Sequence, residues 1–349
     1  MTATLVAPGG GDAVALGRRR RRRRRLVATL VLAVLVVGLY VASLCLGRTA
    51  YSPAEVLAVV RGELVPGASF TVGELRLPRA SMALLTGFAF GAAGATFQTM
   101  LRNPLASPDV IGITSGASAA AVIGLVVLEL SPTATSAAAI VAALATALAI
   151  QGLAGRDGAA GARLVLVGIG VAAMLDSVVS YVVARAAQWD LQVAMRWLTG
   201  SLNGATWDGV VPVLVAVLLA APVLLSRGRA LELLQHGEET AAALGVPVAR
   251  TRLVCLVAAV VLLAFATAAS GPIAFVAFLA GPIAARVVGP GGSLLLPAGL
   301  VGAALVLGAD LLGQTALDAR YPVGVVTGVL GAPYLLHLLV RTHRSGGSL

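Results

Sequence analysis

Few side chains in this sequence could attack a substrate, transfer a proton or bind a metal. The two cysteines, Cys45 and Cys255, lie in apolar stretches far apart in the chain, a spacing that predicts neither a disulfide framework nor a metal site. The three histidines, His236, His337 and His343, are scattered and suggest no cofactor. The sequence has no lysine, hence no GxxxxGK[ST] nucleotide-binding loop, and it has neither HExxH nor a recognisable catalytic spacing of paired carboxylates. We therefore expect no catalytic residue, no metal and no directly bound cofactor.

Two acidic residues lie inside otherwise apolar stretches. Asp176 is followed by Ser177, Ser180 and Tyr181, and Asp310 lies in a later stretch. A carboxylate at membrane depth is costly and usually faces protein or water. The polar patch that begins at Asp176 therefore predicts either a surface lining a water-filled route or a hydrogen bond between packed helices. The sequence leaves both interpretations open, and Asp310 is similarly ambiguous.

The elements that must position these residues follow from composition. Of the 349 residues, 58% are hydrophobic and 11% are charged, and the mean hydropathy is +0.95; a typical soluble domain is about 45–50% apolar and about 25% charged. This excludes a soluble enzyme, a coiled coil and a disordered chain. The apolar stretches are continuous rather than alternating, which favours helices over a β-barrel. We predict an all-α, polytopic membrane helix bundle of about ten spans of about 20 residues. The spans are expected near residues 26–46, 80–100, 110–129, 134–153, 164–184, 209–226, 252–270, 273–289, 294–312 and 322–340.

All 25 basic residues are arginines, and eight of them form the run Arg18–Arg25 directly before the first apolar stretch. Such a run can bind nucleic acid or anionic lipid, but in this place it more simply indicates topology, because cytoplasmic segments are enriched in arginine. With the N-terminus inside, 18 arginines fall in inner segments and 7 in outer ones. We predict a multi-pass membrane protein, surrounded by membrane lipid, with both termini cytoplasmic and no nucleic-acid partner.

The predicted organisation has a basic cytoplasmic tail (1–25), a transmembrane domain (26–340) and a cytoplasmic C-terminal tail (341–349). The longest inner loop, 227–252, contains a helix-like stretch followed by Gly245 and Pro247, a helix stop signal. Glycines also recur at four-residue spacing, which lets helices approach closely and predicts a tight bundle. These pairs are Gly87/Gly91, Gly112/Gly116 and Gly324/Gly328.

One long stretch, Arg76–Ala117, reads RLPRASMALLTGFAFGAAGATFQTMLRNPLASPDVIGITSGA. It closely resembles the permease subunits of bacterial ABC importers for iron-siderophores and vitamin B12, the FecCD-type family. The family pattern is RLPR, spaced glycines, a glutamine and then NPLAxPxxLGxxxGA. The matching residues are Arg76, Pro78, Arg79, Gly87, Gly94, Gln98, Asn103, Pro104, Leu105, Ala106, Pro108, Gly112, Gly116 and Ala117.

Three later stretches agree with the family in order. They are WLTGSL at 197–202, GPIAFVAFLAGPIAARVVG at 271–289, and Asp310 followed by PVGVVTGVLGAP at 322–333. The resemblance covers roughly residues 26–340, and WLTGSLNG together with PVGVVTGVLGAPYLL look most like ferric-catecholate (enterobactin-type) permeases.

The sequence departs from the family pattern at three places. The usual histidine after a proline falls at Ile283, where Gly281 precedes Pro282; the usual glutamate before LPVG falls at Arg320; and an outer-face arginine of the vitamin B12 permease aligns near Gln314. No substrate inference is therefore drawn from the vitamin B12 member.

The resemblance implies a permease subunit of the bacterial cytoplasmic membrane that moves ferric siderophore inward by alternating access. It implies a second permease subunit, identical or different, two separate ABC ATPase subunits that use the ATP, and an extracytoplasmic substrate-binding protein. Vitamin B12 or haem remain alternative cargoes within the family. An ion-coupled secondary transporter would need several intramembrane charges, and a membrane enzyme would need a catalytic cluster.

The resemblance also implies roles for particular residues. An ATPase would dock on a short helix of the inner loop, for which the alternative is an ordinary solvated helix. The coupling residues are Glu238, Glu239, Ala241, Ala242, Leu244 and Gly245. The binding protein would dock through its carboxylates on Arg76 and Arg79, with Arg320 as a further contact, because the arginine fork pairs bidentately with carboxylate; the alternative is snorkelling at the lipid surface.

The remaining expected sites are the route and its supports. In the family the fifth span and its dimer mate line a central route, so the pathway residues would be Asp176, Ser177, Ser180 and Tyr181. Gln98 and Asn103 would cap broken helix ends near Pro104 and Pro108, and Gly112 and Gly116 belong to the same structural motif.

Overall fold

Apolar helices make up nearly all of the structure. The computed structural model describes residues 10–107, 112–154, 160–316 and 320–344, and these residues form fourteen α-helices and one π-helix, without a strand. In chain order they are α1 (Gly10–Cys45), α2 (Pro53–Val60), η1 (Ser69–Arg76), α3 (Leu77–Met100), α4 (Ile113–Val126), α5 (Pro132–Ala154), α6 (Ala160–Arg185), α7 (Gln188–Leu198), α8 (Trp207–Ser226), α9 (Gly228–Leu234), α10 (Glu238–Ala243), α11 (Val248–Ser270), α12 (Val276–Val288), α13 (Leu295–Thr315) and α14 (Val323–Arg344). The predicted all-α class is confirmed.

Each predicted span corresponds to an apolar helix. Seven helices are long and apolar enough to cross a membrane: α1, η1 continued by α3, α5, α6, α8, α11 and α13. Three more, α4, α12 and α14, contribute shorter apolar helices, 113–126, 276–288 and 323–336. The polytopic bundle is therefore confirmed. The number of ten crossings stays a prediction, because a helix needs about 20 residues to cross the hydrocarbon core.

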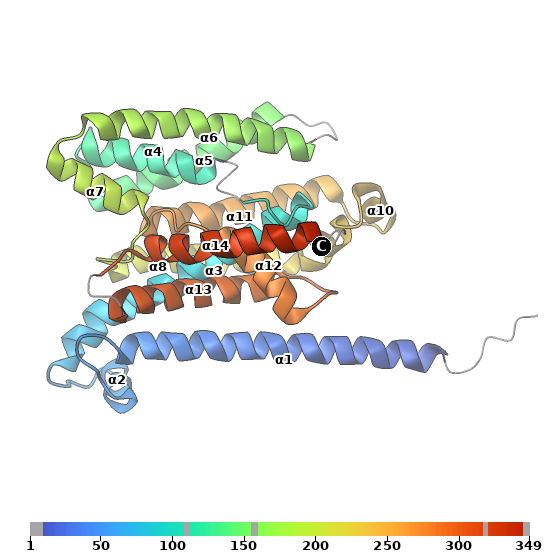
Figure 1. Cartoon of the computed structure of the whole chain (residues 1–349), viewed down its shortest axis with the longest axis horizontal. Coiled ribbons are helices and arrows are strands. Elements are labelled where there is room, and N and C mark those ends of the chain that lie inside the picture. The colour runs from blue at the N-terminus through green and yellow to red at the C-terminus, as the bar shows by residue number, and fades with distance from the viewer. Residues whose placement is uncertain (1–9, 108–111, 155–159, 317–319, 345–349) are drawn as a thin grey trace, which may run out of the picture.

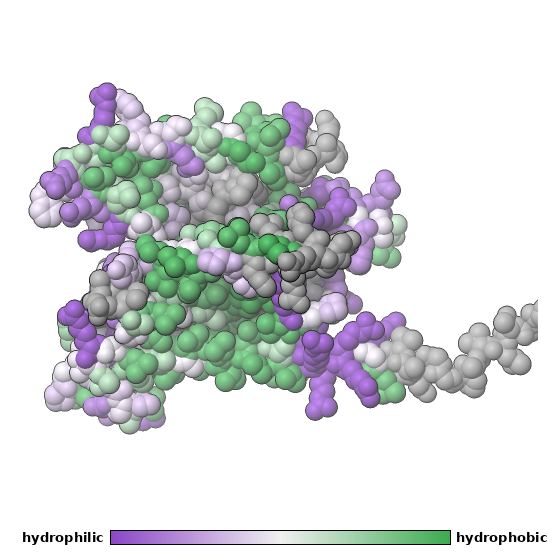
Figure 2. Space-filling view, in the orientation of Figure 1, coloured by the Kyte–Doolittle hydropathy of each residue, from purple (hydrophilic) through white to green (hydrophobic). Residues whose placement is uncertain are grey.

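The long helices run roughly alongside one another, so the bundle has two ends (Figure 1). One end carries α2 and α7 and is called the α2 end; the other carries α10 and the last turns of α14 and is called the α10 end. Hydrophilic residues gather at both ends, and hydrophobic residues cover much of the surface between them (Figure 2). The described parts of the segments predicted as outer lie at the α2 end, and the described parts of those predicted as inner lie at the α10 end.

Helix α3 packs most extensively on α13, α11, α12 and α8. Its backbone approaches that of α13 closely: a Cβ atom on Gly91 would overlap the carbonyl oxygen of Ala298, and one on Gly302 would overlap that of Gly87. Small residues allow backbones to approach to this distance, which confirms the tight packing predicted for Gly87/Gly91. Gly328 differs, because no heavy atom lies within 4 Å of the place where its Cβ would be.

Helix α12 depends on a side chain of α3. Pro282 has no N–H, so the carbonyl of Phe278, four residues earlier, lacks its donor within the helix. Nε2 of Gln98 donates to this carbonyl at 2.8 Å, and a Cβ on Gly281 would overlap Oε1 of Gln98. Gln98 therefore satisfies the interrupted α12 rather than a helix end near Pro104.

The predicted outer segment 47–79 folds into α2 and η1 at the α2 end. Helix α2 begins with a capping box: the Ser52 N–H donates to the Glu55 carboxylate at 2.7 Å, and the Glu55 N–H donates to the Ser52 hydroxyl at 3.3 Å. The hydrogen bonds from the backbone and then the hydroxyl of Ser52 lower the pKa of the Glu55 carboxyl below its ordinary value.

Candidate functional site

Three loops that are distant in sequence meet beside one cavity. The Ser201 N–H donates to the Ser270 carbonyl at 2.7 Å, and the Gly324 N–H donates to the Gly200 carbonyl at 3.0 Å. Side chains would block these contacts: a Cβ on Gly200 would overlap the Pro272 carbonyl oxygen. The stretches WLTGSL, GPIAFVAF and PVGVV are thus joined through their backbones.

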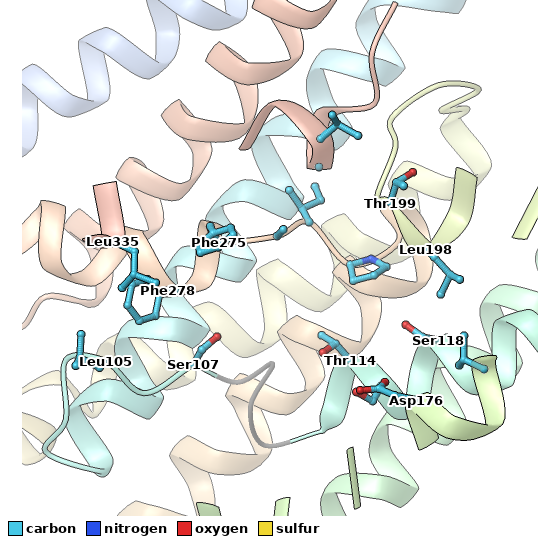
Figure 3. A pocket seen from close by; sticks show the side chains of 17 residues that line it. Leu105, Ser107, Thr114, Ser118, Asp176, Leu198, Thr199, Phe275, Phe278 and Leu335 are labelled. Carbon is cyan, nitrogen blue, oxygen red and sulfur yellow. The ribbon is translucent and has the colours of Figure 1, made fainter. Parts of the chain in front are cut away.

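The cavity itself has a volume of about 640 Å³ and lies between the α4 and α6 side of the bundle and the α12 and α14 side (Figure 3). We call it the interlayer cavity. Its lining residues are Leu105, Ser107, Thr114, Ser115, Ser118, Asp176, Val179, Leu198, Thr199, Pro272, Ile273, Ala274, Phe275, Phe278, Gly324, Val325 and Leu335. The wall is mainly apolar, with a few hydroxyl groups, two phenyl rings and one carboxylate.

Asp176 supplies that carboxylate. It lies on the exposed side of α6, and in the described part of the chain it makes no side-chain hydrogen bond to another helix, so the second of the two interpretations left open by the sequence is not seen there. Ser177 and Ser180 donate to carbonyls one turn earlier in α6, those of Ala173 and Asp176. These serines and Tyr181 are exposed but do not line the interlayer cavity. Of the four predicted pathway residues, the structure therefore brings only Asp176 to the cavity.

A second cavity, of about 610 Å³, opens at the α2 end and is rich in arginine. We call it the arginine mouth. Its arginines are Arg48, Arg76, Arg79, Arg196 and Arg320, and no acidic side chain is among its lining residues. Such a concentration of guanidinium groups attracts anions or the carboxylates of a partner.

Two of these arginines are held inside the chain. The guanidinium of Arg76 donates to the Leu44 carbonyl at 2.8 Å and the Thr49 carbonyl at 2.6 Å, and its Cζ lies 5.1 Å from the ring centre of Tyr51. Arg76 therefore fastens the connection between α1 and α2 to the start of α3. A contact between Arg76 and a binding protein, as predicted, would have to form while these hydrogen bonds are kept.

Arg79 makes a bidentate ion pair with Asp310 of α13. Nη2 lies 2.7 Å from Oδ1 and Nε lies 2.9 Å from Oδ2, while Nη1 donates to the Asn203 amide oxygen at 2.6 Å. Gln314 donates to the same carboxylate at 2.6 Å. The Asp310 side chain is 3% exposed and that of Arg79 is 15% exposed. This network resolves the ambiguity of Asp310: it neutralises Arg79 and joins α3, α13 and the loop after α7.

The predicted coupling residues lie at the α10 end. Helix α10 ends at Ala243, and Gly245 follows with φ +82°, so the predicted stop is confirmed. Ala241 is fully buried, which removes it from the surface that we predicted it to offer.

The exposed part of this segment is Glu239, Ala242, Leu244 and Gly245, with Leu244 61% exposed. Glu238 pairs with Arg252 at 2.6 Å and so fixes α10 to the first turn of α11.

The remaining motif residues support the bundle. The Asn103 amide oxygen accepts the Leu105 N–H at 2.9 Å, which turns the chain after α3. Gly112 has φ +82° directly before α4, and a Cβ on Gly116 would overlap Thr146 of α5. Pro104 lies in the same turn as Asn103, whereas Pro108 lies outside the described residues.

Residues 32–341 match the model of the FecCD transport family. The chain belongs to this family. The ferric enterobactin transport system permease protein FepG of Escherichia coli (strain K12) is 41% identical over 302 residues, which cover 85% of this chain and 91% of that protein. The achromobactin transport system permease protein CbrC of Dickeya dadantii (strain 3937) is 40% identical over 311 residues, which cover 88% and 89%. An inward-facing structure of a metal-chelate type ABC transporter superposes with a TM-score of 0.81 at 27% identity, covering 90% of this chain and 98% of that one.

Sequence reasoning missed several residues of this FecCD-family site. Phe275 and Phe278 line the interlayer cavity, but in the sequence they read as ordinary apolar residues. Phe275 has φ +65°, which is an unusual backbone conformation for a bulky residue. No local sequence pattern predicts it. Arg48 and Arg196 line the arginine mouth, and their position in predicted outer segments was the available signal.

Proposed function

We propose that this FecCD-family chain is the membrane subunit of an ABC importer that carries ferric siderophores of the catecholate type inward across the cytoplasmic membrane. The proposal is carried by the interlayer cavity, whose wall is built from every motif stretch that the sequence shares with the family. The relatives FepG and CbrC, named for ferric enterobactin and achromobactin transport, support the cargo class.

The chemistry of the two cavities suits an anionic aromatic cargo. A ferric catecholate carries negative charge at the catechol oxygens and presents flat aromatic rings. The arginine mouth offers exposed guanidinium groups on Arg48, Arg196 and Arg320, and the interlayer cavity offers the rings of Phe275 and Phe278 for offset stacking.

The mouth also suits a binding protein that docks through carboxylates. Arg76 and Arg79, the predicted docking residues, are engaged by carbonyls and by Asp310, so we assign the larger part of the docking to the exposed Arg320, together with Arg48 and Arg196. Arg76 and Arg79 then keep the surface in shape beneath them.

A second permease subunit would cover α6. This helix exposes large apolar side chains, with Leu166 and Met174 each 72% exposed, beside the polar residues that follow Asp176. At the α10 end, the exposed Ala242 and Leu244 offer an apolar contact for a separate ATPase subunit, which would transmit its closure as a rigid-body shift.

The test is uptake into proteoliposomes that contain this chain with its co-expressed partners. We expect inward transport of radiolabelled ferric enterobactin that requires ATP and the binding protein, and that falls when Phe278 is changed to Ala. Transport that persists without ATP and collapses with an uncoupler would refute the ABC mechanism. Transport of vitamin B12 or haem in place of ferric enterobactin would refute the cargo.

A further inference from the structure

One face of α1 at the α10 end combines guanidinium groups with an apolar floor. Its residues follow the spacing i, i+3, i+4, i+7 and i+8, which places them on a single side of a helix. With one residue of α12 they line a groove of about 430 Å³, called here the α1–α12 groove. Its residues are Arg20, Arg23, Arg24, Val27, Ala28 and Val287.

The charge of this groove is open to a ligand. Arg20, Arg23 and Arg24 are exposed. Over the described ranges the ion pairs are Arg79–Asp310 and Arg252–Glu238, so no carboxylate neutralises these three arginines there.

The neighbouring Arg25 has a different role. Its guanidinium donates to the carbonyl of Gly289 at 3.3 Å and to that of Ser293 at 2.8 Å. These carbonyls belong to the connection between α12 and α13, so Arg25 ties α1 to the element that supplies Val287. The groove therefore has a fixed shape without using its own arginines.

The groove lies where a lipid headgroup would lie. The apolar stretch 26–46 begins directly after the arginine run, and at about 1.5 Å per residue Arg23 and Arg24 are within about 5 Å of it along the helix axis. Leu26 and Leu30, just beyond, are 62% and 55% exposed. The surface accordingly changes from hydrophilic to hydrophobic along this end of α1 (Figure 2).

We propose that the α1–α12 groove binds one anionic phospholipid. The phosphate accepts hydrogen bonds from Arg20, Arg23 and Arg24, because the arginine fork matches phosphate oxygens, and the first acyl carbons lie against Val27 and Val287. An acidic protein partner would need only the arginines. In this groove the arginines are followed by apolar surface that faces lipid, which suits a headgroup with its acyl chains. The bound lipid joins α1 to α12. The proposal is independent of the cargo and of the ATPase.

The test compares two triple variants of the full chain, purified in a neutral detergent, by native mass spectrometry with added lipid. The groove variant is Arg20→Gln, Arg23→Gln and Arg24→Gln. The matched control is Arg18→Gln, Arg19→Gln and Arg22→Gln, which removes the same charge from the same run outside the groove.

We expect the wild type to retain phosphatidylglycerol in preference to phosphatidylcholine. The groove variant should bind phosphatidylglycerol roughly 100-fold more weakly, since each arginine near an anionic headgroup contributes about fivefold. The control should lose less than about fivefold. If the groove variant folds poorly, the same three positions changed to lysine keep the charge; their binding should fall between that of the wild type and that of the glutamine variant, because lysine lacks the bidentate fork.

Three results would overturn the proposal. Equal losses in the groove variant and its control would mean diffuse attraction rather than a site. Displacement of phosphatidylglycerol by millimolar inorganic phosphate would mean an anion site without a lipid. Unchanged lipid binding with loss of a co-purifying protein would mean that the groove is a protein interface.

Discussion

The ion pair between Arg79 and Asp310 gives the sharpest test of how the α2 end is built. The perturbation is the removal of one partner at a time, Arg79→Gln or Asp310→Asn, followed by the double replacement Arg79→Met and Asp310→Leu. Arg79→Gln leaves a carboxylate that is 3% exposed with Gln314 as its remaining side-chain donor. Asp310→Asn leaves a guanidinium that still bonds Asn203 and faces the arginine mouth.

The two single variants should therefore differ. Loss of one partner from a buried pair costs about 3–5 kcal/mol, because the other charge stays buried without compensation. We expect Arg79→Gln to reach this range. Asp310→Asn should cost less, about 1–2 kcal/mol, since Arg79 can be solvated through the mouth. The double apolar variant should recover most of the loss of Arg79→Gln, because replacing both members of a buried pair is often close to neutral.

The measurement is the free energy of unfolding in mixed micelles, monitored by circular dichroism. Arg196→Gln is the matched control: this arginine lines the same cavity but is exposed, so its loss should change stability by less than about 0.5 kcal/mol. If Arg79→Gln costs no more than Arg196→Gln, or if the double variant is as unstable as the sum of the singles, the pair does not hold α3 to α13.

Three further predictions follow from the packing and the exposed surfaces. Gln98→Leu should cost about 1–3 kcal/mol of unfolding free energy, because the α12 carbonyl that it satisfies is left buried without a donor; a stability unchanged from wild type would contradict this. Gly91→Ala should cost about 3 kcal/mol of unfolding free energy by overpacking. Gly328→Ala, whose new Cβ would lie in open space, should leave stability unchanged or raise it by up to about 1 kcal/mol through helix propensity. Equal melting temperatures of the two variants would contradict this prediction. Leu244→Arg should abolish co-purification of the ATPase subunit and leave folding intact. Leu64→Arg should not, because Leu64 is also exposed (92%, against 61% for Leu244) but lies between α2 and η1; loss in both or in neither would disprove a contact at α10.

The sequence determines the helices well and their interruptions poorly. Each predicted span corresponds to an apolar helix because continuous runs of about 20 apolar residues have few alternatives in a bilayer. The start of α12 could not be located in this way. Residues 271–275 give no local signal for where the helix begins, and the start depends on the left-handed backbone of Phe275. The interruption at Pro282 is compensated by the hydrogen bond from Gln98 to Phe278, which is a contact across 180 residues of sequence.

The candidate site shows the same limit at the level of single residues. The pattern RLPR located Arg76 and Arg79 correctly at the α2 end but not what they contact, because Leu44 and Asp310 are 32 and 231 positions away. Likewise the helical periodicity of α10 predicted a helix without saying that Ala241 would face inward. Residue type and spacing identify an element, whereas the partner of each side chain is set by tertiary contacts.

Backbone and side chains contribute differently to the wall of the interlayer cavity. Gly200, Gly271 and Gly324 meet neighbouring carbonyls so closely that a Cβ on any of them would overlap an oxygen, so these motif positions determine the shape of the wall and contribute no side chain to it. The chemical character of the wall comes from the few side chains between them, above all Asp176, Phe275 and Phe278, of which only Asp176 stood out in the sequence. Selectivity among cargoes should therefore change with substitutions at these three positions, while substitutions at the glycines should abolish folding before they alter selectivity.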